Sequence, residues 1–134
     1  MTPIASVNDL SPDIVLSAAD HHQLSILAIA GLDHTPEQAD NLLYELERAR
    51  VVDDDAVPDD IVRMGSKVSY RTDGGQHPTV TLVYPVDADI ERGRISVMTP
   101  VGTALIGLRK GQSITWRGRD NRKHMLTVLN VAAP

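Results

Sequence analysis

Apolar residues in the first part of the chain recur at helical spacing in two successive stretches. The first predicted helix follows a good N-cap at Ser17 and extends to about Leu32, with an apolar face wide enough for contacts on two sides. The second begins at Thr35-Pro36, an N-cap and a first-turn proline, and its leucines keep helical spacing through Arg50. The break at residues 31–34 is short, so we expect an antiparallel helical hairpin with a reach of about 20 Å. Residues 1–16 show no such period and are expected to be irregular.

Beyond Lys67 the pattern changes to the two-residue alternation that is typical of strands. Thr99-Pro100 interrupts it, because proline has no N–H for a sheet, and the small and aliphatic residues Val101–Leu108 predict a short helix. Asp87–Gly93 is expected to be a polar loop. Five strands and one helix imply the α+β class, with an antiparallel sheet covered on one face. The predicted strands are Lys67–Arg71, Thr79–Tyr84, Arg94–Val97, Ser113–Trp116 and Met125–Val131.

Charge divides the chain at the acidic stretch 53–60, which Pro58 interrupts. Residues 1–60 hold 13 acidic residues against two bases, a formal charge of −11, whereas residues 61–134 hold 5 against 11, a charge of +6. This asymmetry and the change of period predict two units, a helical hairpin in residues 1–55 and a sheet domain in residues 56–134. A solvated acidic face would explain the charge alone equally well.

Candidate chemical motifs in the sequence are incomplete. The chain has no cysteine, which excludes disulfides, thiolate chemistry and cysteine-bound metals. The adjacent His21 and His22 point about 100° apart on a helix and cannot share a metal ion. Aspartates 53–55 lack the glycine and glutamate of a calcium loop, and Gly102 and Gly107 have P-loop spacing without the Lys-Ser/Thr pair. We therefore expect no enzyme activity, no cofactor, no metal and no small-molecule substrate.

The start of the chain has neither a basic region nor an apolar run, so no signal peptide is expected. The apolar stretch 24–32 is too short to cross a bilayer. The sequence therefore predicts a soluble cytoplasmic protein with no membrane partner.

Four basic residues gather in the loop between the last two predicted strands, enough to contact a phosphate group. Trp116 is the only aromatic residue near them, so the pattern is a weak signal for contact with RNA or DNA. The four residues are Arg117, Arg119, Arg122 and Lys123.

The segment Ser96–Leu108, which reads S-V-M-T-P-V-G-T-A-L-I-G-L and is followed by Gly111, resembles the C-terminal domain of Gre-type transcript cleavage factors. The segments V-x-M-G-S-x-V at Val62–Val68 and T-L-V-Y-P at Thr81–Pro85, with the short hairpin, are closer to a related family, the regulators of nucleoside diphosphate kinase. The resemblance covers about residues 40–131 well and the first 35 in outline. It implies a short N-terminal coiled coil and an FKBP-like antiparallel sheet with one short helix.

The resemblance does not imply prolyl isomerase activity. The isomerase pocket of FKBP-like proteins is lined by aromatic side chains. The predicted sheet domain has only Tyr70, Tyr84 and Trp116 and no phenylalanine.

The resemblance also implies a partner, RNA polymerase, contacted at its secondary channel. In Gre factors the coiled-coil tip carries acidic residues that hold a catalytic magnesium inside the polymerase. Here the tip offers two acids at a different spacing on a short hairpin, and methionine precedes the docking turn where Gre factors usually have an acid. The docking turn matches Thr99, Pro100 and Val101, and with Met98 just before it these are the residues expected to contact the polymerase. The tip matches Asp33, His34 and Glu37.

The implied function is a non-enzymatic regulator that modulates elongation or competes with Gre factors, with an effect on nucleoside diphosphate kinase levels, direct or indirect. Two alternatives stay open. One is a transcript cleavage factor that stimulates the polymerase nuclease, for which the tip carboxylates are the discriminating feature. The other is a small RNA-binding module that uses the basic residues of Arg117–Lys123.

Overall fold

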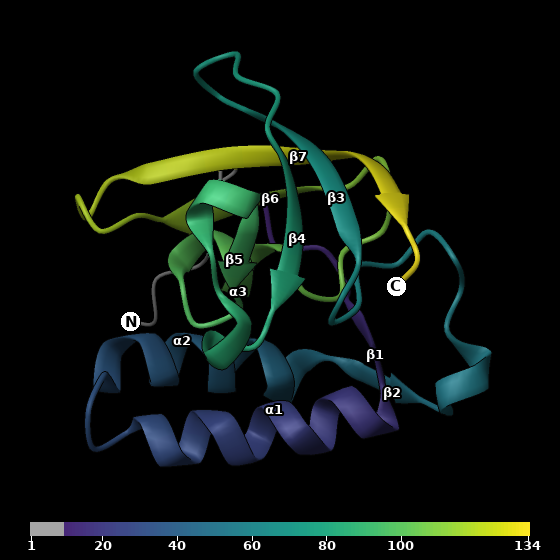
Figure 1. Cartoon of the computed structure of the whole chain (residues 1–134), viewed down its shortest axis with the longest axis vertical. Helices are drawn as coiled ribbons and strands as arrows, with labels where there is room; N and C mark the ends of the chain where they lie inside the picture. Colours follow the sequence, from purple (N-terminus) through teal and green to yellow (C-terminus); the bar gives the residue numbers. More distant parts are fainter. Residues whose placement is uncertain (1–9) are drawn as a thin grey trace, which may run out of the picture.

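The computed structural model describes residues 10–134, with the helical hairpin in one layer and the sheet in another (Figure 1). Ser17 caps α1 (Ala18–Gly31) as expected, because its Oγ accepts a hydrogen bond from the Asp20 N–H at 3.0 Å. Pro36 begins α2 (Pro36–Arg48), but the side chain of Thr35 caps no N–H group. The two helices lie antiparallel and pack against each other (Figure 1). Across residues 10–134, no helix has the length and apolar character needed to cross a membrane.

Two short strands flank the hairpin and correct the expectation of an irregular start. β1 (Val15–Ser17) pairs in parallel with β2 (Arg50–Val52), so the end of the supposedly irregular segment is ordered. Because the chain joins β2 at Arg50, α2 ends at Arg48 and not at Arg50 as the leucine spacing suggested. Strands of three residues are too short to show a period in the sequence. The prediction for residues 1–9 lies outside the described residues.

Five strands form the second sheet, in the order β5-β4-β3-β7-β6. Neighbouring pairs are antiparallel except β4 and β5, which are parallel, so the prediction of an antiparallel sheet is wrong at this edge. The reason is the connection: two short 3-10 helices, η2 (Pro85–Asp87) and η3 (Ile90–Arg92), return the chain to the level at which β4 began. The strands are β3 (Lys67–Thr72), β4 (Thr79–Val83), β5 (Arg94–Ser96), β6 (Ser113–Arg117) and β7 (Lys123–Ala132).

The short helix α3 spans Pro100–Leu105. The sequence predicted a helix that extends to Leu108, so α3 is shorter than expected. Gly107 takes the left-handed conformation, with φ of +80°, and an added Cβ would lie 2.9 Å from the Cβ of Ile14. Its N–H donates to the Val62 carbonyl and its carbonyl accepts from the Val15 N–H. This glycine therefore joins β1 to the segment that follows α3.

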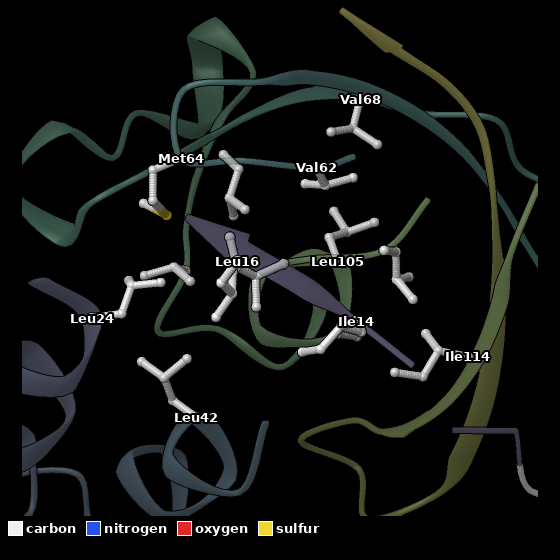
Figure 2. Close-up of a cluster of buried hydrophobic side chains, with 14 of the residues drawn as sticks. Ile14, Leu16, Leu24, Leu42, Val62, Met64, Val68, Leu105 and Ile114 are labelled. Atoms are coloured by element: carbon white, nitrogen blue, oxygen red, sulfur yellow. The ribbon is translucent and has the colours of Figure 1, made fainter. Parts of the chain in front are cut away.

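Buried side chains of the hairpin and of the five-stranded sheet form one continuous cluster. Leu16, which is 1% exposed, lies between Leu24 and Leu42 of the helices and Val68 of the sheet (Figure 2). Separating the two units would expose apolar surface on both, so they depend on each other for part of their burial. A division between residues 55 and 56 stays a prediction.

The acidic linker is held against the start of α1. It contains η1 (Asp54–Ala56), and the Asp54 carboxylate accepts a hydrogen bond from the Ala19 N–H at 2.9 Å. Nearby, the Asp20 carboxylate accepts from the Met64 N–H at 3.2 Å, across the junction of the two units. Burial raises the pKa of Asp20, and this effect outweighs the lowering by the Met64 hydrogen bond and by Arg63.

Candidate functional site

Hydrogen bonds between near neighbours hold the turn before α3. Thr99 is the N-cap of this helix, and its Oγ1 accepts from the Gly102 N–H at 3.0 Å and donates to the Ser96 carbonyl at 2.7 Å. Thr103 donates to the Val97 carbonyl at 2.7 Å. An added Cβ on Gly102 would lie 2.1 Å from the Ser96 carbonyl oxygen, so only glycine fits there. The turn therefore has a single, well-determined conformation.

The four residues matched to a docking turn are all half-buried. Met98 and Val101 pack against the core, and the terminal methyl of Met98 lies close to Gly31 at the end of α1. Pro100 occupies the first position of α3. A partner would therefore contact the outer sides of these residues, and the docking role itself stays a prediction.

The hairpin tip is exposed and lies beside this turn. The side chains of Asp33, His34 and Glu37 are exposed and make no hydrogen bond or ion pair within the described part of the chain. The neighbouring Gln38 donates from Nε2 to Thr103 Oγ1 at 2.8 Å and so joins the first turn of α2 to α3. The hairpin lies along the sheet layer (Figure 1), and this bond links its tip region to α3.

One shallow groove brings together residues from three predicted sets: Glu37 of the tip, Pro100 of the turn, and Arg117 and Arg119 of the basic loop. Two further grooves, one along α2 and one along Trp116, also include Pro100 in their lining. We call the surface formed by these three grooves the Pro100 face. Four of the predicted residues line none of the three: Asp33, His34, Met98 and Arg122.

The basic loop has a defined turn. Arg117 donates from Nη1 to the Asn121 carbonyl at 2.7 Å, and Asn121 has a φ of +60°. The Asp120 carboxylate accepts from the Arg122 N–H at 3.0 Å and lies 3.1 Å from His124 Nε2. The Arg122 hydrogen bond, followed by the one with His124, lowers the pKa of Asp120. The carboxylate charge is therefore stabilised inside the loop.

Several residues of the Pro100 face were not found by sequence reasoning. Ile90 is 85% exposed and lines the groove along Trp116, although its segment was expected to be a polar loop. Arg94 lines the same groove, and Tyr44, which is 62% exposed, lines the one along α2. A single isoleucine in a polar loop carries no sequence signal, because the hollow next to it is built from distant segments.

Within residues 10–134, no three side chains of the metal-binding types His, Cys, Asp and Glu come together as a metal site. Asp54, which belongs to the triple aspartate of the linker, accepts a hydrogen bond from the Ala19 N–H through its carboxylate. What the Pro100 face offers is a rigid turn, apolar hollows and arginine side chains, which suit binding to another macromolecule.

Comparison with known families divides the chain into two matched parts. The family model "Transcription elongation factor, GreA/GreB, C-term" matches residues 57–133, and the model "Rnk N-terminus" matches residues 12–52. The first covers the sheet and α3, and the second covers the hairpin with β1 and β2.

Individual proteins agree with these matches. The "Regulator of nucleoside diphosphate kinase" of Escherichia coli K12 is 40% identical over 110 residues, 78% of each chain. A "Transcription elongation factor GreA" of Roseiflexus castenholzii is 36% identical over 87 residues, 64% of this chain and 55% of that protein. The solved structure of a "Prokaryotic transcription elongation factor GreA/GreB from Nitrosomonas europaea" superposes with a TM-score of 0.72 at 34% identity, covering 90% of this chain and all of the other.

Proposed function

The chain belongs to the GreA/GreB family of transcription elongation factors, as a member with an Rnk N-terminus, and on that premise we propose that it binds RNA polymerase through the Pro100 face. Its relation to Gre factors and to the Rnk regulator makes it a transcription-associated regulator. The observation that carries the proposal is the turn at Thr99–Gly102: it has one conformation and lies where three grooves meet. A rigid turn loses little conformational entropy when it docks, which favours binding.

The finer features follow the family. We propose that the sheet unit is FKBP-like, that the hairpin is a short coiled coil, and that the protein acts in the cytoplasm at the secondary channel of the polymerase. Of the tip acids, Asp33 lies in the turn between α1 and α2 and Glu37 in the first turn of α2. The two helices have 14 and 13 residues, which limits the reach of the hairpin to about 20 Å. On this account the chain occupies the Gre site without stimulating cleavage, and so modulates elongation or competes with Gre factors. The Escherichia coli relative is named as a regulator of nucleoside diphosphate kinase, and we propose an effect on the levels of this enzyme here, direct or indirect.

A weak contact with RNA or DNA is the second candidate. Arg119 and Arg122 are exposed in the loop next to Trp116, whose ring stacks on His124 at a centroid distance of 4.9 Å. Phosphate contacts of this kind weaken steeply with salt. Binding of a labelled RNA oligonucleotide that vanishes at physiological salt would agree with an accessory contact beside the polymerase.

Binding to immobilised core RNA polymerase, followed by biolayer interferometry, tests the main proposal. We expect the chain to bind and an excess of a Gre factor to displace it. Pro100→Glu places a carboxylate on the face while keeping a residue that suits the first turn of a helix, and it should weaken binding by about tenfold or more. Pro85→Glu is the matched control, since Pro85 also begins a short helix but is exposed and lines none of the three grooves. Equal binding by the two variants would contradict the proposal.

A further inference from the structure

The groove along Trp116 combines an apolar lining with a protruding aliphatic side chain. Its volume is 560 Å³, and Ile95, Val101 and Trp116 contribute to its lining. Ile90 adds a side chain that is 85% exposed. Because Ile90 is part of the lining, hollow and side chain form one continuous apolar surface, and such surfaces mark protein contacts.

Two arginines give this groove a positive charge. Arg94 and Arg119 both line it, and within residues 10–134 neither side chain has a hydrogen-bond or ion-pair partner. The acid in the lining, Asp120, is occupied by the His124 ring and by the Arg122 N–H. The groove therefore presents two free guanidinium groups, each able to form a paired hydrogen bond with a carboxylate.

The apolar lining favours a protein over a nucleic acid as the occupant. A single-stranded base binds by stacking on an open aromatic face. The ring of Trp116 is already stacked on His124, with an angle of 29° between the planes. Tyr70, the second aromatic ring of the lining, is only 7% exposed. The aliphatic residues of the lining suit an aliphatic side chain; they are Ala88, Ile90, Ile95, Pro100 and Val101.

We propose that this groove binds an acidic segment of RNA polymerase, in which an aliphatic side chain enters the hollow beside Trp116 and neighbouring carboxylates pair with Arg94 and Arg119. Two observations support this occupant. The groove presents two arginines without a partner in residues 10–134, and it is continuous with the docking turn, since Thr99, Pro100 and Val101 also line it. The inference rests on the proposed function and deepens it by naming the chemistry of the partner segment.

The test measures the affinity of wild type and of the double variant Arg94→Glu/Arg119→Glu for immobilised core RNA polymerase. It uses about 0.05 M and about 0.2 M salt, which lie below and above the physiological ionic strength of about 0.15 M. We expect the double variant to bind about tenfold more weakly at the lower salt and to lose most of the salt dependence seen with wild type. Ile90→Ser should weaken binding about threefold at both salts, because it removes apolar contact and no charge.

Arg71→Glu is a charge-reversal control at a single position away from the groove. Arg71 is exposed on β3, and as the neighbour of Tyr70, which lines the groove, it points to the opposite face of the sheet. The affinity of the Arg71→Glu variant for the polymerase should stay within about twofold of the wild-type affinity, because a surface charge away from the groove is screened by salt. Trp116 is the only tryptophan of the chain, so an unchanged fluorescence spectrum shows that the groove of each variant is intact.

The outcomes separate the two claims. If wild type binds and Pro100→Glu does not, while Arg94→Glu/Arg119→Glu binds as wild type does, the proposed function stands and this inference is wrong. If wild type does not bind the polymerase, the proposed function fails and the named partner fails with it. If the two arginines prove necessary only for binding a labelled oligouridine, they contact nucleic acid and the inference is overturned.

Discussion

The docking turn and the hairpin tip lie beside each other, but the chain holds them in different ways. The turn at Thr99–Gly102 is closed by two hydrogen bonds of one threonine hydroxyl and by a glycine that admits no side chain. At the tip, Asp33, His34 and Glu37 are exposed, and within residues 10–134 their side chains have no partner. The two meet through Gln38, which bonds to Thr103 of α3.

This difference assigns separate roles to the two regions. A surface that must dock in one orientation benefits from a fixed conformation, because little entropy is lost on binding. Exposed tip residues are free to change without cost to the fold. We therefore expect substitutions in the turn to affect stability or polymerase binding. Substitutions of Asp33 and His34, which line none of the three grooves, should affect neither strongly.

The largest expected effect is the loss of stability in Gly102→Ala. The new Cβ would lie 2.1 Å from the Ser96 carbonyl oxygen and 2.8 Å from the Val97 Cα, so backbone has to move. We expect a loss of about 3 kcal/mol in the free energy of unfolding, measured by urea denaturation.

Gly31→Ala, on the hairpin side, is the matched control. Its Cβ meets the terminal methyl of Met98 at 3.0 Å, and that flexible side chain can shift. Since alanine also favours a helix, the net change should stay within about 1 kcal/mol. A Gly102→Ala protein as stable as Gly31→Ala would show that the turn is not rigid.

A smaller effect is expected from removing the link between tip and turn. Gln38→Ala deletes the 2.8 Å hydrogen bond from Nε2 to Thr103 Oγ1, while Thr103 keeps its bond to the Val97 carbonyl. The free energy of unfolding should fall by about 1 kcal/mol. Gln23→Ala, at an exposed position of α1, should change it by less than about 0.5 kcal/mol. If both variants are equally stable, the tip is not coupled to α3.

The smallest effect concerns the other end of the hairpin, at Asp20. Burial raises its pKa above the ordinary 3.8, so between 3.8 and the raised value the folded chain binds more protons than the unfolded chain. By linkage, this group makes the folded state less stable as the pH rises through that window. Asp20→Asn keeps an acceptor for the Met64 N–H but cannot titrate, so its stability should fall less over the same window. Urea denaturation at several acidic pH values gives the free energy of unfolding as a function of pH for wild type, for Asp20→Asn and for the control Asp40→Asn, which changes an exposed residue. The same pH dependence in wild type and Asp20→Asn would contradict the prediction.

Features that depend on near neighbours could be predicted from the sequence. The cap at Ser17, the proline starts of α2 and α3, and the turn at Gly111, whose φ is +90°, are each set by a few adjacent residues. The five strands also follow from the local period. For the same reason the motifs at Ser96–Leu108, Val62–Val68 and Thr81–Pro85 together indicated the family, which the comparisons confirm.

Features that depend on distant segments could not be predicted. The pairing of β1 with β2 and the parallel pairing of β4 with β5 join segments whose own residues do not specify the partner. The Pro100 face likewise arises because Gln38 meets Thr103 across 65 positions of the chain. Ile90 became a site residue only because Trp116 and Ile95 form a hollow next to it.

Transcript cleavage in a backtracked elongation complex tests the central claim most directly, namely that the chain occupies the Gre site without serving as a cleavage factor. The account predicts that the chain alone gives no faster RNA cleavage than the polymerase by itself. Added before a Gre factor, it should slow the cleavage that this factor stimulates, and Pro100→Glu should lose this inhibition. Strong cleavage by the chain alone that disappears in Asp33→Ala or Glu37→Ala would contradict the account and make the exposed tip its functional centre.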